Sequence, residues 1–405
     1  MSHSDQQNLL RAEAELLLTE ARKQKSERTK TLGDPIQLAG KALAICVRDG
    51  YAWIAENTTI ARKLDLETGK TLQMYRGHTG PVTCLAFHDK GDGAGDSAIL
   101  ITGSWDQAIK LWDTATKECT STTPAAHSDF VKTLFVIPSL QLLVSGGSDK
   151  IVRFWILTDP LARDLSTATA GTPLTSLGSI SSHTRPVECL DGYAVSPTSA
   201  VLYTADTMGV IKAWDLDKRA GSWHSTLRTE LTHHRTRINE MVLGNGQLWT
   251  ASSDETVQIL ENPLDAASRP LPPLAHPVAV RAILPLGTTG LAEPYVLTGA
   301  GDIIRAYDVS SPAEPELLGE VDAHWHDVTA LRLWVRRSAG GSGQTRVEPW
   351  VISASLDGTI RRWRLSELLH PPPKTAAPAP APIPEEDGFT MTEEEERELA
   401  ELLED

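Results

Sequence analysis

Short segments in which apolar and polar residues alternate recur through most of the chain. Two examples are Val82–Phe87 (VTCLAF) and Ile99–Thr102 (ILIT), and clusters of Gly, Asp, Asn or Ser lie between such segments. Alternation over four to eight residues, bounded by turn-forming residues, is typical of short β-strands joined by tight turns. The pattern predicts an all-β protein.

The strand segments belong to an internal repeat. The stretch 102–113 (TGSWDQAIKLWD) has close copies at 145–156 (SGGSDKIVRFWI) and 353–364 (SASLDGTIRRWR), and looser copies at 54–65, 204–215, 250–261 and 298–308. A histidine precedes six of the seven copies and has Val or Ile four residues after it; the pairs are His78/Val82, His127/Val131, His183/Val187, His234/Ile238, His276/Val280 and His324/Val328. Consecutive histidines are 42 to 56 residues apart. Four short strands in about 45 residues form one propeller blade.

The repeat resembles the WD40-repeat family, whose two signature dipeptides are matched by Gly77-His78 and Trp112-Asp113. The resemblance covers roughly residues 31–365 and implies a seven-bladed WD40 β-propeller with short helical N- and C-terminal extensions. It also implies a buried hydrogen-bond network of His, Ser or Thr, Asp and Trp in each complete blade. The complete sets by position are His78/Thr102/Asp106/Trp112, His127/Ser145/Asp149/Trp155 and His324/Ser353/Asp357/Trp363.

Other copies depart from this pattern. Met208 stands where the turn Asp is expected, Leu260 replaces the Trp, and the copy with Asp302 is one residue short and ends in Tyr307. We expect these blades to be held mainly by apolar packing.

The last blade lacks a fourth strand of its own. After Arg364 the chain soon reaches Pro371–Pro373, and proline cannot donate to a strand ladder. We expect residues 31–38 to close the ring by pairing beside 359–363, which leaves no open sheet edge. The predicted organisation is an N-terminal helical extension (1–30), the propeller (31–365), a Pro/Ala-rich linker (366–388) and an acidic C-terminal helix (389–405).

A histidine, a hydroxyl and an aspartate could form a hydrolase triad, but here they recur around the ring, and the resemblance implies that an indole N–H engages each hydroxyl. A buried polar group needs such a partner, so the network is interpreted as structural and no enzyme activity is expected. Neither a cofactor nor a metal is expected, because the four cysteines are far apart and His233-His234 lacks further ligands.

The formal net charge of −15 argues against direct nucleic-acid binding, which depends on clustered Lys and Arg. Charges interrupt every apolar run before it reaches the length of a membrane span, so no membrane insertion is expected. These features predict a cytoplasmic or nuclear protein.

Partner binding is expected on one face of the ring, here called the rim face. In similar proteins its contacts come from residues that flank the first strand of each blade and from the residue before the turn Asp. The candidates here are Trp105, Phe130, Lys132, Arg237, Arg281 and Leu356. Aromatic and Arg residues are enriched at binding hot spots. The cations favour an acidic or phosphorylated peptide, whereas the alternative is that the aromatic side chains only cover the blades.

The two termini are further candidates for binding. Residues 385–405 contain eleven acids and one base, and Thr392 begins a capping box before Leu399, Leu402 and Leu403, which share one helical face. This tail could be a solubilising end, a helix that folds on a partner, or a cap on the protein's own rim. Gln6–Glu27 is predicted to be helical and either docks on the propeller or forms a short coiled coil.

The sequence favours a non-enzymatic scaffold or adaptor, a monomeric propeller within a multiprotein complex that binds other proteins. One alternative is a substrate receptor of a ubiquitin ligase, although neither Trp112-Asp113 nor Trp214-Asp215 continues into the W-D-x-R signature of cullin-4 adaptors. Another is a subunit of a ribosome-assembly or other RNA–protein complex.

Overall fold

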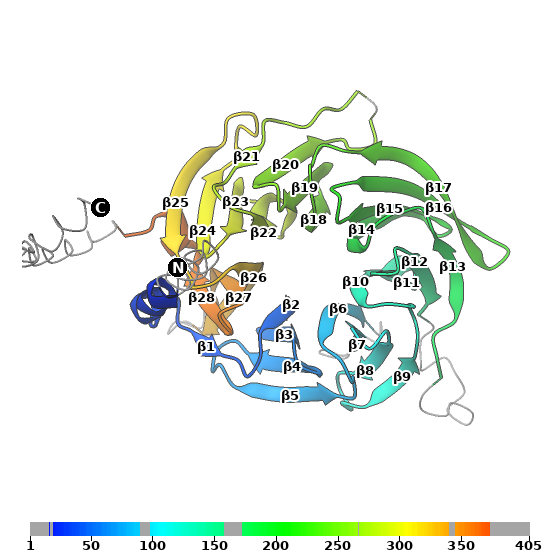
Figure 1. Ribbon diagram of the computed structural model, residues 1–405, viewed down its shortest axis with the longest axis horizontal. Coiled ribbons are helices and arrows are strands. Elements are labelled where there is room, and N and C mark those ends of the chain that lie inside the picture. Colours follow the sequence, from blue (N-terminus) through cyan, green and yellow to red (C-terminus); the bar gives the residue numbers. More distant parts are fainter. Residues whose placement is uncertain are drawn as a thin grey trace, which may run out of the picture. The chain divides into compact units, whose positions relative to one another are not determined.

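The computed structural model describes residues 16, 19–89, 98–157, 172–265, 267–339 and 345–372. They form a ring of seven four-stranded antiparallel sheets, as Figure 1 shows. The predicted fold class, a seven-bladed β-propeller, is confirmed.

Each blade runs from an inner strand at the centre of the ring to an outer strand at its edge. Blades one to three contain β2(Ala42–Arg48), β3(Tyr51–Glu56), β4(Ile60–Asp65), β5(Thr71–Arg76); β6(Val82–Asp89), β7(Ala98–Ser104), β8(Ile109–Asp113), β9(Cys119–Thr123); and β10(Val131–Ile137), β11(Leu142–Gly147), β12(Val152–Ile156), β13(Ser176–Ile180). Blades four and five contain β14(Val187–Ser196), β15(Ser199–Asp206), β16(Ile211–Arg219), β17(Ser222–Leu231); and β18(Ile238–Gly244), β19(Gln247–Ser252), β20(Thr256–Glu261), β21(Leu274–Ala275). Blades six and seven contain β22(Val280–Pro285), β23(Tyr295–Ala300), β24(Ile303–Asp308), β25(Glu316–Asp322); and β26(Val328–Ala339), β27(Thr345–Ser355), β28(Thr359–Arg364), β1(Ile36–Gln37). Short 3-10 helices follow two inner strands, at η1(Pro138–Leu140) and η2(Leu286–Thr288).

Several hairpins are set by two residues with positive φ. Asn245 and Gly246 have φ of 51° and 76° between the paired residues Gly244 and Gln247. Asn-Gly tolerates this left-handed backbone, whose twist matches that of the flanking strands. The turn sequence therefore fixes the register of β18 and β19.

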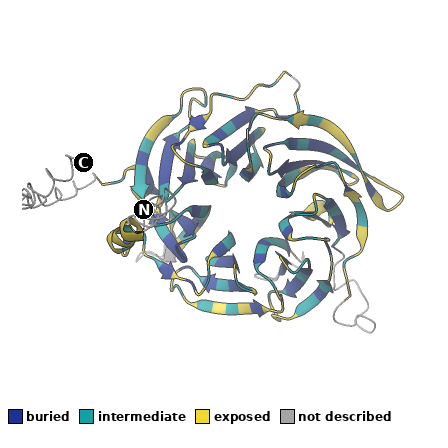
Figure 2. Ribbon diagram, viewed as in Figure 1, coloured by how far each residue is buried: buried dark blue, intermediate teal, exposed yellow. Residues whose placement is uncertain are grey.

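The core lies between neighbouring blades. Figure 2 shows mostly buried middle strands, inner strands that mix buried and intermediate residues, and outer strands with exposed stretches. Inner strands are also joined across blades by a side chain next to the first strand residue: Thr83 Oγ1 donates to Val131 O (2.5 Å), Asn239 Nδ2 to Val280 O (2.7 Å) and Thr329 Oγ1 to Ala42 O (3.3 Å). These bonds satisfy carbonyls at the centre of the ring.

The seventh blade takes its outer strand from the N-terminal side of the chain. Strand β1 pairs antiparallel with β28, with Ile36 opposite Ile360 and Gln37 opposite Thr359. Just before β1, Gly33 has a φ of +65°, and a Cβ there would lie 2.4 Å from the ring of Trp363. Only glycine fits this close approach.

The described part of the N-terminal extension, a helix over 19–29, docks on blades six and seven. Lys25 Nζ lies 2.5 Å from a carboxylate oxygen of both Asp302 and Asp322. Arg361, a buried side chain of blade seven, donates to the carbonyl oxygens of Thr29 and Leu32. Charged contacts therefore anchor the helix beside the closing strand.

The chain after β28 differs from the expected linker. Helix α2(Leu365–Leu369) buries Leu365, Leu368 and Leu369, and the compact unit extends to Pro371. The expected linker boundary at residue 366 did not allow for these leucines, which complete the core of blades six and seven. The acidic helix expected at 389–405, with Leu399, Leu402 and Leu403, lies outside the described residues.

Candidate interaction sites

The three complete repeat sets form the same four-residue network. His78 Nδ1 lies 2.8 Å from Asp106 and its Nε2 2.7 Å from Thr102 Oγ1, to which Trp112 Nε1 donates at 2.9 Å. The other two sets repeat this arrangement: His127 with Asp149 (2.9 Å) and Ser145 (2.7 Å), Trp155 with Ser145 (2.8 Å), His324 with Asp357 (2.8 Å) and Ser353 (2.8 Å), and Trp363 with Ser353 (2.9 Å). Each network joins the second and third strands of its blade to the turn between them and to the loop before the blade.

Blade four also contains a complete network, which corrects the expectation that apolar packing mainly holds it. His183 lies 3.0 Å from Asp206 and 2.7 Å from Thr204, and Trp214 donates to Thr204 at 3.0 Å. Asp206 comes two residues after Thr204 rather than four. A carboxylate at that strand position reaches the histidine that the turn Asp reaches in other blades. The sequence signal for a complete network is therefore an Asp either two or four residues after the Ser or Thr.

Blade five keeps three of the four partners, so the same expectation was wrong there in part. His234 contacts Asp254 (3.0 Å) and Thr250 (2.8 Å), and the buried Leu260 occupies the Trp position. The missing indole removes one hydrogen bond but not the His–Asp contact.

Blade six uses a reduced network. His276 lies 2.9 Å from Thr298 Oγ1 and 3.3 Å from the Tyr307 hydroxyl, and its Nδ1 faces the Leu274 carbonyl oxygen at 3.1 Å. Asp302 does not join this network and instead accepts from Lys25. The shortened repeat thus provides an anchor for the N-terminal helix.

Blade one replaces the network with a buried ion pair. Glu56 is fully buried, and Arg62 Nε lies 2.5 Å from its Oε1. Arg62 Nη1 also donates to Thr71 Oγ1 at 2.8 Å. The degenerate first repeat therefore keeps a polar link between its strands by a different pair of residues.

The chemistry of the networks is structural. The hydroxyl-bearing residues Thr102, Ser145 and Ser353 are all 0% exposed, so a substrate has no path to them. Burial alone would raise the pKa of Asp106 and Asp357, but hydrogen bonds from their histidines and from backbone N–H groups lower it to about 2 in both. These carboxylates stay charged at neutral pH and orient the histidines.

The histidines make stability depend on pH. Burial lowers the pKa of His233 and His276 to about 4, and lowers that of His234 and His324. Their stabilising contribution is therefore present above pH 6.5 and lost as the pH falls toward 4, because the unfolded chain binds more protons. Asp191, whose pKa burial raises to about 6, opposes this trend. We expect the free energy of unfolding to fall by roughly 1–3 kcal/mol between pH 6.5 and 5.

Urea unfolding at a series of pH values measures this loss. His233→Gln removes one of the titrating groups and should make the pH dependence shallower. An equal slope in wild type and variant would show that His233 is not shielded from water.

On the rim face, the structure brings two candidate residues together. The rings of Trp105 and Phe130 stack with centroids 4.8 Å apart and an angle of 15° between their planes. Their side chains remain 43% and 38% exposed. The pair is an apolar surface at the junction of blades two and three.

The three cations of the rim face are neutralised within the structure. Arg237 lies 2.8 Å and Lys132 3.4 Å from the two carboxylate oxygens of Glu188, and Arg281 lies 2.8 Å from Asp327. Trp105, Lys132, Glu188 and Arg237 share the lining of one central cavity of about 380 Å³. The sequence did not reveal that Glu188 lies between Lys132 and Arg237, because the three residues come from three different blades.

The remaining rim candidate, Leu356, is half-buried in blade seven. Blade one separates it from the aromatic pair of blades two and three, and it is not among the residues that line the central cavity. The six candidates are therefore an aromatic pair, three basic residues that are already ion-paired, and one isolated leucine.

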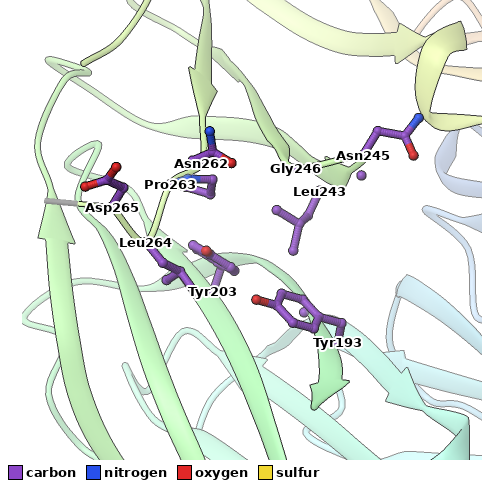
Figure 3. A pocket seen from close by; sticks show the side chains of 11 residues that line it. Tyr193, Tyr203, Leu243, Asn245, Gly246, Asn262, Pro263, Leu264 and Asp265 are labelled. Atoms are coloured by element: carbon purple, nitrogen blue, oxygen red, sulfur yellow. The ribbon is translucent and has the colours of Figure 1, made fainter. Parts of the chain in front are cut away.

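A second cavity lies at the opposite edge of the sheets, between blades four and five. It has a volume of about 520 Å³, and Tyr193, Tyr203, Leu243, Pro263 and Leu264 are among its lining residues (Figure 3). The sequence did not single out these residues, which come from separate repeats.

The described part of the chain contains neither a cluster of metal ligands nor a membrane-spanning helix. No group of three or more His, Cys, Asp or Glu residues there is arranged to hold a metal ion. Among the same residues, no helix has the length and apolar character needed to cross a membrane.

Seven four-stranded blades with recurring His–hydroxyl–Asp–Trp networks define a β-propeller of the WD40 type. The family described as "WD domain, G-beta repeat" matches residues 69–113 and 117–155. The chain is a WD40-repeat protein.

Proteins with quite different names are similar in sequence to this chain. An uncharacterized WD repeat-containing protein of Schizosaccharomyces pombe is 29% identical over 77% of this chain and 74% of its own length. The ribosome biogenesis protein YTM1 of Ajellomyces capsulatus is 33% identical over 36% of this chain and 26% of its own length. The human kinesin-like protein KIF21A is 26% identical over 51% of this chain and 11% of its own length. The chain thus spans only a minor part of the last two.

Proposed function

We propose that this protein is a non-enzymatic scaffold or adaptor that binds other proteins through its rim face and its terminal segments, in the cytoplasm or the nucleus. The observation that carries the proposal is the exposed Trp105–Phe130 stack beside the central cavity. Rigid aromatic surfaces of this kind are frequent anchors of protein interfaces.

The ion pairs of the three rim-face cations limit which ligands can bind there. An acidic or phosphorylated peptide must displace Glu188 from Lys132 and Arg237, or Asp327 from Arg281. Apolar contact with the aromatic pair then supplies the affinity, and charge supplies selectivity.

Affinity purification with mass spectrometry tests the rim face. Trp105→Ala combined with Phe130→Ala should remove the main partner, while stability changes little because both side chains are partly exposed. Leu227→Ala with Leu317→Ala is the matched control, since these leucines are 44% and 50% exposed on outer strands. A partner that survives the aromatic variant but not Arg237→Glu with Arg281→Glu would place the anchor on the basic positions.

The tail is tested by a chain that ends at Pro372, just beyond the compact unit. Loss of the main partner on this truncation would make the acidic segment, with Leu399, Leu402 and Leu403, the tether. Retention would leave the rim face as the main site.

A second candidate function is membership of a ribosome-assembly complex. The similarity to a protein named for ribosome biogenesis supports it, although relatives with unrelated names are also similar in sequence to this chain. Co-sedimentation of the tagged chain with pre-ribosomal particles tests this role; its absence would favour the general scaffold. A ubiquitin-ligase receptor remains an alternative, which copurification of a cullin would support.

A further inference from the structure

The central cavity, with a volume of about 380 Å³, has a net charge opposite in sign to that of the whole chain. Its charged lining residues are three cations and two carboxylates: Lys132, Arg237, Arg332, Glu188 and Glu240. Burial raises the pKa of the Cys84 and Cys189 thiols, which also line the cavity and therefore stay neutral. The chain as a whole has a formal net charge of −15. A net positive cavity in such an acidic protein favours an anion, because its low-dielectric walls concentrate the field.

Arg332 is the cation of this cavity that was not among the rim-face candidates. It lies on β26, and its Nε donates to Ile45 O at 3.0 Å. Its Nη1 donates to Glu240 Oε1 and to Leu331 O, both at 2.7 Å. Its Nη2 donates to no acceptor among the described residues and is not one of the buried unpaired atoms there. Since the side chain is 34% exposed and lines the cavity, a ligand can reach this free donor group.

The two carboxylates of the cavity already have partners. Glu240 Oε2 accepts from Ile283 N at 2.7 Å, and its Oε1 accepts from the guanidinium described above. Glu188 Oε2 accepts from Arg237 at 2.8 Å, and its Oε1 lies 3.4 Å from Lys132 Nζ. The cavity therefore has free donors but no unpaired carboxylate, so it favours a ligand rich in acceptors over a cationic one.

We propose that the central cavity binds a single carboxylate of a partner peptide, which accepts from the free Nη2 of Arg332. One negative charge balances the excess positive charge of the lining, whereas a phosphate group of charge about −2 would leave the cavity negative. Binding at Arg332 breaks no ion pair, in contrast to binding at the rim-face cations. Apolar residues beside the carboxylate pack on the Trp105–Phe130 stack, because Trp105 lines the same cavity. This inference rests on the proposed function and narrows its acidic or phosphorylated ligand to a carboxylate.

Titration of the full-length chain with acetyl-Leu-Leu-Asp amide tests the proposal. The methyl NMR signal of Met241, which lines the cavity, is the readout, and that of Met74 on the outer strand β5 is the internal reference. We expect a saturable shift of Met241 alone with a Kd below about 1 mM, and about tenfold weaker binding of the neutral acetyl-Leu-Leu-Asn amide. Acetyl-Leu-Leu-Asn with a free C-terminus should bind more tightly than its amide if a terminal carboxylate is the source. Phosphoserine in place of the Asp should bind no more tightly than the Asp peptide.

Two variants separate the guanidinium donor from the overall charge. Arg332→Met combined with Glu240→Gln leaves the net charge of the lining unchanged, and the glutamine amide oxygen can still accept from Ile283 N. This double variant should weaken binding of the Asp peptide about tenfold. Glu188→Gln adds one positive charge to the lining and should strengthen binding about three- to tenfold, which a misfolded chain would not show. Arg281→Met, which removes a rim-face cation outside the cavity lining, is the matched control and should bind as wild type does.

Equal affinity for the Asp and Asn peptides, or equal affinity in wild type and the double variant, would overturn the assignment. Tighter binding of the phosphoserine peptide would overturn the choice of a singly charged group. Neither outcome touches the proposed scaffold function, which is judged by partner capture with Trp105→Ala and Phe130→Ala. Failure of that capture test alone would instead remove the scaffold proposal and leave the carboxylate site in place.

Discussion

Replacing Asp357 with alanine is expected to lower the free energy of unfolding by about 3–4 kcal/mol. Asp357 accepts from Thr359 N (2.8 Å) and Thr359 Oγ1 (2.6 Å), and contacts His324 Nδ1 at 2.8 Å. Its removal leaves these buried groups without an acceptor. It also removes the carboxylate 3.9 Å from the buried Arg361. The change lies in the blade that closes the ring.

Urea unfolding followed by tryptophan fluorescence measures this loss. Asp215→Ala is the control, because Asp215 is also a repeat aspartate but its ion pair with Arg228 is exposed; its effect should stay below about 1 kcal/mol. A loss below 1 kcal/mol for Asp357→Ala would contradict the structural role. Loss of partner binding without loss of stability would instead make Asp357 a binding residue.

Replacing Arg62 with methionine is expected to cost about 3–5 kcal/mol, because it leaves the carboxylate of Glu56 buried without its cation. The two side chains are joined by the 2.5 Å contact and by a second one of 3.3 Å. The remaining side-chain partner of Glu56 is Thr58 Oγ1, at 3.5 Å. A hydroxyl at that distance does not compensate a buried charge.

The double variant Glu56→Met with Arg62→Met should recover most of that stability, since it removes the unpaired charge and fills a similar volume with apolar atoms. The same unfolding measurement compares both variants. If the double variant is as unstable as Arg62→Met alone, blade one needs the ion pair itself and not only the absence of an unpaired charge.

The fold was predictable because the repeat is encoded locally. Each complete copy contains the residues of its strands, its turn and its buried polar network within about 45 residues. The positions of His78, Thr102, Asp106 and Trp112 therefore predicted a shared network. The structure places these side chains within hydrogen-bonding distance. The missing fourth strand of blade seven was likewise visible, because prolines follow β28 where a strand would have to continue.

The degenerate blades were less predictable. Comparison at fixed repeat positions placed Met208 where the turn Asp is expected and indicated that the contact was missing. In the structure, Asp206 contacts His183 from a position two residues earlier. Whether a side chain two residues away reaches its partner depends on strand twist and backbone geometry, which a positional comparison does not contain. The ion pair of Glu56 and Arg62 escaped notice for the same reason.

By itself, the sequence determined the number of blades, the networks of the complete repeats, the source of the closing strand and the acidic character of the tail. These follow from periodicity and composition, which act over short stretches of chain. Tertiary structure alone decided that Glu188 neutralises Lys132 and Arg237, that Lys25 bridges Asp302 and Asp322, and that Tyr203 lies unpaired in a cavity. Each of these depends on residues far apart in the chain, which come within contact distance only when the blades pack against one another and the N-terminal helix docks on them.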